Sequence, residues 1–389
     1  MKTNNAFSNH ARVDMDMLLP GTMRMPMKTT KAIFGLLKIT SGLTGRICTS
    51  SLVPLLSLLL IMPLSGAQAA VVFTSLYSFT GTNDGANPAA ALVQGSDGNF
   101  YGTTQGGGTT NYNGCMDTVG FGTVFKISPN GALTSLYSFT GGNDGELPMA
   151  GLVLSNDGYF YGTTYGVGCY GSPGTVFKIS PNGALTTLYS FGGGNDANPT
   201  AGLVQGSDGF FYGTTSGGMV ANKLGTVFKI SPKGTLTSLY SFTGGNDGEW
   251  PVGGLVLGSD GNFYGTTSDE WDYAFYGTVF RITTNGALTT LYSFTGGDDG
   301  SWPMAALVQG SDGYFYGTTG GYFESGGLEF IVNNGTIFKI STNGTLTTLY
   351  TLGGWNEGAN PVAALVQGTD GHYYGTTAHN SAELWGGRY

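Results

Sequence analysis

Histidine and cysteine are scarce in this chain of 389 residues, which holds three of each. His372 and His379 both lie near the C-terminus, so a histidine-based triad or a histidine-rich metal site cannot recur along the chain. Seven of the 15 Lys and Arg residues, but only two of the 24 Asp and Glu residues, fall within 1–69. Residues 70–389 therefore hold 8 Lys and Arg against 22 Asp and Glu, a net charge of about −14. Nucleic-acid-binding proteins present a basic surface, so this balance argues against nucleic acid as a partner.

Helical periodicity is absent after residue 69. No segment there keeps apolar residues at a 3.6-residue spacing, and each of the chain's 69 glycines would cost about 1 kcal/mol inside a helix. The same region has no second apolar stretch long enough to span a bilayer. The sequence therefore predicts an all-β, monomeric protein with no membrane span in this part.

The first 69 residues have the composition of an export signal. Basic residues precede the apolar run LVPLLSLLLIMPL at 52–64, and the small residues after it end in Ala67, Gln68 and Ala69, the A-x-A pattern of a signal-peptidase site. We predict cleavage after Ala69, which makes 1–69 a signal peptide with an N-terminal extension and 70–389 a secreted or cell-surface protein. The alternative is an uncleaved anchor, although the run is shorter than the roughly twenty apolar residues of a spanning helix. A start at an internal methionine is a second hypothesis for the long basic region: Met23, Met25 or Met27.

A repeat dominates the rest of the chain. LYSF or a close variant recurs at steps of 60, 52, 51, 52 and 58 residues, and YGTT occurs six times. The glycine of YGTT predicts a place where a neighbouring backbone approaches closely. YGTT begins at Tyr101, Tyr161, Tyr212, Tyr264, Tyr316 and Tyr374. GTVFKI and its variants begin at Gly122, Gly174, Gly225, Gly277 and Gly335.

Each unit contains four short segments rich in β-branched and aromatic residues, which predict strands. In the first full copy these are 91–94, 100–104, 123–127 and 133–139. Asp97-Gly98 and Asn130-Gly131 separate the paired segments, and such dipeptides favour tight hairpin turns with positive φ at both central positions. The unit is therefore predicted to be a four-stranded antiparallel meander, and its repetition is typical of β-propeller blades.

The two ends of the repeat region predict how a propeller closes. Residues 73–79 match only the fourth strand of a unit, whereas 364–377 match the first and second. Five whole units lie between them, so we predict a six-bladed β-propeller whose last blade is closed by the N-terminal strand. Its third strand has no good match, and 378–389 is the candidate for that place. An open array and a β-solenoid are the alternatives.

The string GSDGNFYGTT…GTVFKISPNGALTSLYSF resembles the glycine-rich tandem repeat of the Gloeo/Verruco (GloVer) type, found in secreted bacterial proteins called choice-of-anchor tandem repeat proteins. The resemblance extends over 73–377. It implies a bacterial extracellular or cell-surface protein, often with a C-terminal sorting anchor, and brings no established activity or catalytic residues. The sequence ends in WGGRY without an apolar anchor helix, which leaves retention by such an anchor open.

Loops of variable length join the second and third predicted strands: 105–121, 165–173, 216–224, 268–276 and 320–334. Variable loops on a rigid scaffold commonly carry binding sites, so we predict a secreted scaffold that binds glycans or proteins through this loop face. The alternative is an extracellular polysaccharide hydrolase or lyase with acidic catalysts on the same face. No unit departs from the repeat as a dedicated active site would require, so we do not expect an enzyme.

A recurrent acidic position falls in the connections between units, on the same predicted face. Six carboxylates around a ring would suit Ca²⁺, which takes six to eight oxygen ligands. The interpretation we favour is an Asn-Asp-Gly turn whose side chains bond their own backbone, with no metal or cofactor. The position is occupied by Asp84, Asp144, Asp196, Asp247, Asp299 and Glu357.

Trp250 and Trp302 precede the recurrent proline in two consecutive connections. With Trp271 and Tyr273 in the neighbouring loop, they are candidates for an aromatic platform that holds a sugar or peptide. The alternative is that the indoles cap the core between blades. Cys115 and Cys169 lie in the variable loops of consecutive units, where a disulfide would suit an oxidising compartment; two free thiols are the other possibility.

Overall fold

The computed structural model describes residues 74–109, 120–166, 174–192, 197–217, 224–268, 275–320, 322–323, 332–353 and 358–378. All of them belong to one compact unit, Phe73–Tyr389. They contain strands, turns and bends but no helix, and hence no helix long and apolar enough to cross a bilayer. Outside the described residues lie the predicted signal peptide and six candidate site residues: Cys115, Cys169, Asp196, Trp271, Tyr273 and Glu357.

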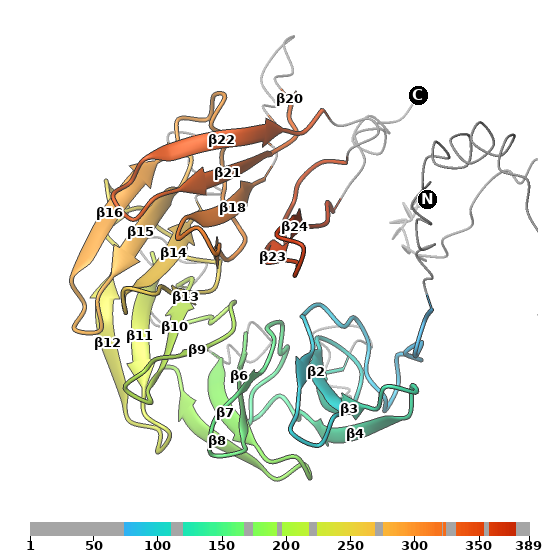
Figure 1. Cartoon of the computed structure of the whole chain (residues 1–389). Coiled ribbons are helices and arrows are strands. Elements are labelled where there is room, and N and C mark those ends of the chain that lie inside the picture. The colour runs from blue at the N-terminus through green and yellow to red at the C-terminus, as the bar shows by residue number, and fades with distance from the viewer. Residues whose placement is uncertain are drawn as a thin grey trace, which may run out of the picture. The chain divides into compact units, whose positions relative to one another are not determined.

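Five four-stranded antiparallel sheets follow one another in chain order, each a meander, as predicted (Figure 1). The first sheet comprises β1 (Val93–Gln94), β2 (Phe100–Thr104), β3 (Thr123–Ile127) and β4 (Leu133–Ser138). The second comprises β5 (Val153–Leu154), β6 (Phe160–Thr164), β7 (Thr175–Ile179) and β8 (Leu185–Ser190). The third comprises β9 (Val204–Gln205), β10 (Phe211–Thr215), β11 (Thr226–Ile230) and β12 (Leu236–Ser241).

The fourth sheet comprises β13 (Val256–Leu257), β14 (Phe263–Thr267), β15 (Thr278–Ile282) and β16 (Leu288–Ser293). The fifth comprises β17 (Val308–Gln309), β18 (Phe315–Thr319), β21 (Thr336–Ile340) and β22 (Leu346–Thr351). A small hairpin that the sequence did not predict, β19 (Tyr322–Phe323) with β20 (Val332–Asn333), lies between β18 and β21. A terminal sheet of two strands, β23 (Val366–Gln367) and β24 (Tyr373–Tyr374), ends the described fold.

The hairpin turns differ from the prediction in one respect. Gly98 has a φ of 79°, but Asp97 does not have positive φ, so positive φ at both central positions is wrong. The N–H of Gly98 donates to the carbonyl of Gly95, and the N–H of Gly95 donates to Asn99, the pattern of a three-residue loop with glycine at its left-handed position. The Asp97 carboxylate instead accepts the N–H of Asn99 and the hydroxyl of Tyr101.

The glycine of YGTT is required by side chains rather than by a neighbouring backbone. A Cβ on Gly265 would lie 2.5 Å from Phe280 Cζ and 2.9 Å from Leu255 Cδ2, so the third strand and the residue just before the first strand of the same sheet fill the space above it. A close backbone approach occurs at a different glycine. In the turn between β15 and β16, a Cβ on Gly286 would lie 2.6 Å from the carbonyl oxygen of Leu239 in the preceding sheet.

Consecutive sheets pack through a repeated aromatic contact. The tyrosine of the second strand stacks on the aromatic residue that begins the second strand of the next sheet, with centroid distances of 3.9–4.0 Å: Tyr101 on Phe160, Tyr161 on Phe211, Tyr212 on Phe263 and Tyr264 on Phe315. A second, edge-to-face contact joins the phenylalanine after the fourth strand to the third strand of the next sheet, as in Phe139 with Phe177 at 5.3 Å. The core therefore consists of apolar layers between sheets.

The ends of the repeat are less regular than predicted. Residues 74–80 form no strand, although 73–79 was predicted to be one, and β24 has two residues where its counterparts have five. Segment 74–80 nevertheless occupies the position of a fourth strand, because Phe79 contacts Phe125 edge to face at 5.1 Å, as Phe139 contacts Phe177. In whole sheets the third strand pairs with both the second and the fourth, and no described segment supplies it here.

The close packing over the YGTT glycine predicts a large local effect on stability. Gly265→Ala should lower the free energy of unfolding by about 1–3 kcal/mol, because its Cβ has no room between Phe280 and Leu255. Gly142→Ala is the matched control, since its nearest neighbour would be Thr140 Oγ1 at 3.5 Å. Urea unfolding of the two variants measures the difference; equal stabilities would contradict this account of the glycine.

Candidate binding face

The connections between sheets and the variable loops are joined by backbone hydrogen bonds. Trp250 donates to the carbonyl of Leu224 at 2.9 Å in the loop of the third sheet, and its own carbonyl accepts the N–H of Ser268 at 3.1 Å in the fourth. In the same way Trp302 donates to Tyr276 at 2.8 Å and accepts from Gly320 at 2.9 Å. Each of these connections therefore holds the loops of two neighbouring sheets, and both kinds of segment lie on one face, the loop face.

Each recurrent acidic residue that the structure describes on this face is bonded to its own connection and to the segment just before it. Asp144 accepts the hydroxyl of Tyr137 at 3.0 Å, together with the N–H and the hydroxyl of Thr140 at 2.9 and 2.6 Å. Asp84, Asp247 and Asp299 repeat this pattern. The structure does not bring the four together, and no group of three His, Cys, Asp or Glu side chains within the described ranges is arranged to hold a metal ion. These are the local bonds that the turn interpretation requires.

These hydrogen bonds also fix the protonation states of the pairs. Burial raises the pKa of Asp84, but hydrogen bonds from Thr80 and Tyr77 outweigh it and lower the pKa to about 2. For Tyr137, burial and then the bond to Asp144 raise the pKa to about 12. In the Tyr77–Asp84 pair, the same hydrogen bond raises the pKa of the Tyr77 hydroxyl. The lowered pKa of the acid and the raised pKa of the phenol both oppose proton transfer within this pair, which suits a structural role in the turn.

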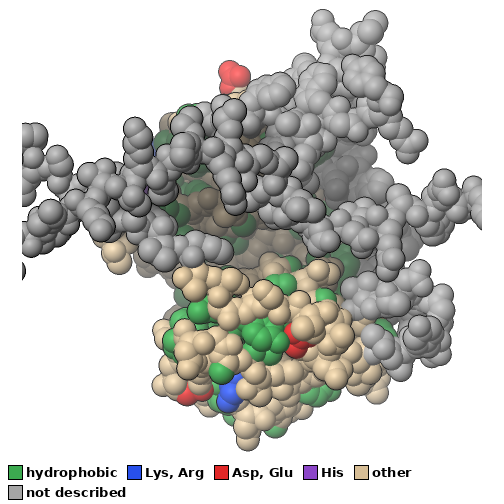
Figure 2. Space-filling view, turned by 90° about the vertical axis from the view of Figure 1, so that its right-hand side faces the viewer, with side chains coloured by type: hydrophobic (Ala, Val, Ile, Leu, Met, Phe, Trp, Pro, Cys, Tyr) green, Lys and Arg blue, Asp and Glu red, His purple; other side chains and the backbone are tan. Residues whose placement is uncertain are grey.

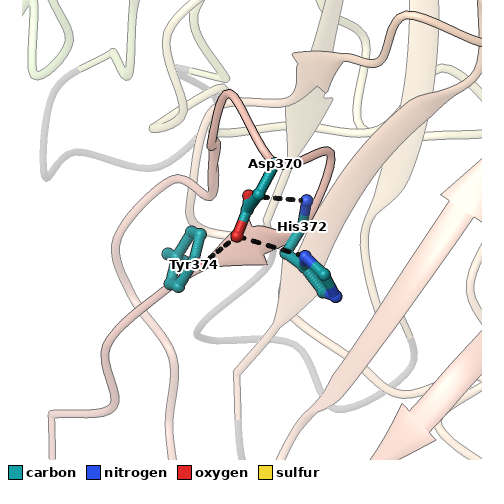
Figure 3. A network of polar contacts seen from close by, with 3 residues as sticks. All are labelled: Asp370, His372 and Tyr374. Atoms are coloured by element: carbon teal, nitrogen blue, oxygen red, sulfur yellow. Dashed lines mark hydrogen bonds and ion pairs between the residues drawn. The ribbon is translucent and has the colours of Figure 1, made fainter. Parts of the chain in front are cut away.

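A second tyrosine–aspartate series lies in the hairpins between the first and second strands, and one copy contains a histidine (Figure 3). Asp370 accepts the hydroxyl of Tyr374 at 2.6 Å and the N–H of His372 at 3.1 Å, while His372 Nδ1 lies 3.2 Å from its Oδ2. The His372 side chain is 76% exposed. The same Asp–Tyr bond occurs in the other copies, where Asn, Tyr or Phe replaces the histidine: Asn99, Tyr159, Phe210, Asn262 and Tyr314. Because the bond does not depend on His372, this group stabilises a hairpin.

The backbone of Trp250 and Trp302 adopts a conformation that bulky side chains avoid. Their φ angles are 54° and 55°, in the left-handed region. Asparagine, which tolerates this region best among non-glycine residues, fills the position in three copies: Asn87, Asn198 and Asn360. Backbone preference therefore does not explain tryptophan at 250 and 302, and both side chains are half-buried on the loop face.

A small pocket of about 150 Å³ lies on the loop face of the fourth sheet. Its walls come from the connection 244–249 and from the start of β15 with the preceding loop residues, and include Glu249, Phe275 and Tyr276. Phe275 is 42% exposed. Glu249 directly precedes Trp250, and the carbonyl of Tyr276 accepts the N–H of Trp302, so the backbone links both tryptophans to the pocket walls.

Comparison with known protein families identifies the family of this chain. The model of the Gloeobacter/Verrucomicrobia repeat matches residues 64–206 and 150–387. The chain belongs to this repeat family. The resemblance stated from the motifs is therefore confirmed, and each of the five whole units is one four-stranded meander.

Solved structures resemble the Gloeobacter/Verrucomicrobia repeat protein in fold alone. Hydrazine synthase of Kuenenia stuttgartiensis is 14% identical with a TM-score of 0.51, over 79% of this chain and 76% of that chain. The calcium-binding protein regucalcin of Agrobacterium tumefaciens is 13% identical with a TM-score of 0.41, over 72% and 78%. An exo-β-1,3-galactanase of Phanerochaete chrysosporium is 13% identical with a TM-score of 0.41, over 69% and 67%. No curated protein matches the sequence.

The pocket residues of this repeat protein were missed by the sequence analysis. Glu249 occupies a position where most other units have a small residue: Ala86, Ala197, Ser301 and Ala359, with Glu146 the other exception. Comparing units position by position would have singled out the two glutamates. Phe275 belongs to a variable loop where the units cannot be aligned, so no repeat-based signal was available for it. Tyr276 can be aligned, because it directly precedes GTVFRI, but the residues at this position share no type: Phe121, Pro173, Leu224 and Asn334.

The tyrosine–aspartate bonds predict how stability depends on pH. Burial, and then the bond to Asp260, raise the pKa of Tyr264 to about 12 from its ordinary value of 10.0. A raised pKa gives stabilisation that is complete below about pH 10 and lost as the pH rises towards 12. Tyr264→Phe should lose about 0.5–1.5 kcal/mol at neutral pH and show a smaller decrease between pH 10 and 12 than the wild type. Urea unfolding across this range tests it, with the more exposed Tyr314→Phe as control; an unchanged pH dependence in Tyr264→Phe would refute the assignment.

Proposed function

We propose that this protein is a secreted or cell-surface binding scaffold, a closed six-bladed propeller that holds carbohydrate on its loop face. The supporting observation is the pocket on the fourth sheet, which combines the carboxylate of Glu249 with the aromatic side chains of Phe275 and Tyr276. Aromatic rings offer apolar surface to a sugar ring, and a carboxylate accepts hydrogen bonds from its hydroxyls. A volume of about 150 Å³ is below the ~300–1,000 Å³ of pockets that enclose a whole drug-sized ligand, so it suits a terminal sugar residue.

Binding is favoured over cleavage by the pocket's chemistry. Most glycoside hydrolases need a pair of Asp or Glu residues beside the scissile bond. Glu249 is the one carboxylate among the described lining residues, and the nearby Asp247 is bonded to Tyr240 of β12 and to Thr243. The described lining thus supplies an acceptor for a sugar and a single carboxylate, where a hydrolase would need two.

The rest of the proposal follows from the sequence and the surface. The predicted signal peptide supports secretion, and the half-units at the two ends of the repeat support a closed ring. Figure 2 shows a face on which charged side chains are few and separated by uncharged surface, in keeping with 10% charged residues. The excess of Asp and Glu over Lys and Arg in the sequence argues against nucleic acid as the ligand. The proposed recognition therefore relies on hydrogen bonding and aromatic contact.

The test exchanges Glu249 of the pocket and the adjacent Trp250 for the residues of the other units. Glu249→Ala with Trp250→Asn reproduces the Ala-Asn pair found at 86–87, 197–198 and 359–360, so the backbone should keep its conformation. On a glycan array the wild type should retain a carbohydrate without releasing product, and the double variant should bind it at least about tenfold more weakly, the effect of losing a binding hot spot. Tyr314→Ala, which changes an aromatic residue of the hairpins, is the control and should bind normally.

The other outcomes distinguish the alternatives. Release of oligosaccharide by the wild type would identify a hydrolase or lyase. Equal binding by the wild type and the double variant would show that the binding site is not this pocket. Retention of a protein and of no glycan would refute carbohydrate as the ligand.

A further inference from the structure

We propose that the terminal sheet, β23–β24, and the first sheet of the same chain are neighbours in the register that joins the other consecutive sheets. This inference rests on the closed ring of the proposed function but not on its ligand. It specifies which side chains form the closing interface, and the evidence is the set of contacts that recurs between interior sheets.

Two recurrent interior contacts involve the second strand. Its tyrosine stacks on the residue that begins the second strand of the following sheet, as Tyr212 stacks on Phe263 at 4.0 Å. The first threonine of YGTT donates its hydroxyl to a carbonyl that precedes the first strand of the following sheet, as Thr266 donates to Ala305 at 3.2 Å. These contacts give each sheet a donor side and an acceptor side.

A third contact involves the glutamine at the end of the first strand. Gln309 bonds Ser259 of the preceding sheet through both its amide atoms, with Nε2 donating to Ser259 Oγ at 3.0 Å and Oε1 accepting the Ser259 N–H at 2.9 Å. Gln367 bonds Ser311 in the same way. The glutamine therefore marks the side of a sheet that faces its predecessor.

The terminal sheet and the first sheet both carry side chains for these contacts, but there the side chains are exposed. Tyr374 of the terminal sheet is 53% exposed, whereas its counterparts Tyr161 and Tyr212 are fully buried. On the first sheet, Leu92 is 47% exposed, while its counterpart Leu152 is 8% exposed. Among the described residues the terminal sheet thus has no successor and the first sheet has no predecessor, and the two exposed sides are of complementary kinds.

Applying the interior register to these ends identifies the closing contacts. Tyr374 stacks on Phe100, and the Thr376 hydroxyl donates to the carbonyl of Ala90. Gln94 bonds Thr369, which stands where Ser259 and Ser311 stand in other units. In the described structure Gln94 donates instead to the carbonyl of Gly98 in its own hairpin, at the long distance of 3.4 Å.

The first sheet already carries part of the sixth unit. Leu76 and Phe79 contact it as a fourth strand contacts the following sheet, through Gly131 and Phe125. Docking the terminal sheet beside this segment would bring together the first, second and fourth strand positions of one unit. Both halves lie in one compact unit of one chain, and linked groups meet at an effective concentration that reaches the millimolar range, so the partner is the same chain rather than a second copy.

Paired cysteines test this contact directly. Between the first and second sheets, a Cβ at Gly151 would lie 3.9 Å from the Cβ of Ala90, within the range of a disulfide. The same register places Ala91 opposite Ala363 at the proposed interface. In mature protein with Cys115→Ser and Cys169→Ser, the pair A91C and A363C should form an intramolecular disulfide, mapped by mass spectrometry of the monomer, as readily as the interior control pair A90C and G151C.

Each result decides the question. Disulfide-linked dimers of the A91C and A363C variant would show that a second copy covers the end faces, and failure to cross-link while the control pair links would refute the contact. As a second measurement, Tyr374→Ala should lower the melting temperature about as much as Tyr212→Ala; no shift would mean that Tyr374 stays exposed. Glycan binding by either protein is scored separately, so failure of this interface is distinct from failure of the proposed ligand.

Discussion

The stacking of one tyrosine against the next sheet is the contact on which this fold depends. In each interior copy the tyrosine ring lies about 4 Å from the aromatic residue that begins the same strand of the next sheet. Its hydroxyl is held by the aspartate of its own hairpin. One side chain thus fixes a turn within its sheet and the spacing between two sheets. Because each sheet contacts mainly its neighbours, stability builds up unit by unit, as in other repeat proteins.

The repeat made much of this fold predictable from sequence. The bounds of β2 and β3 agree with the predicted segments to the residue, because six copies of YGTT and five of GTVFKI mark them. The shorter β1 and the missing strand at 74–80 were not predictable in this way, since strand formation there depends on a ladder partner. The left-handed conformation at Trp250 had one weak signal in the sequence, which is the asparagine at the equivalent position of three other units.

Function in such a protein is expected where the units differ. The interior strands are nearly identical, so they cannot distinguish one ligand from another, whereas Glu249, Trp250 and Phe275 belong to one unit or a few. A ligand site of this kind uses the rigid sheets to hold loops that vary freely. The recurrent acidic residues Asp84, Asp144, Asp247 and Asp299 have the opposite role, because each forms hydrogen bonds that stabilise its own turn.

The central claim is that the tyrosine contact couples consecutive sheets. A double-mutant cycle measures this coupling directly, with Tyr212→Leu and Phe263→Leu singly and together, and Phe315→Leu in place of Phe263→Leu as the non-contacting reference. We expect a coupling energy of about 0.5–1.5 kcal/mol between Tyr212 and Phe263 and additive effects for Tyr212 with Phe315. Additivity in the contacting pair would contradict the account.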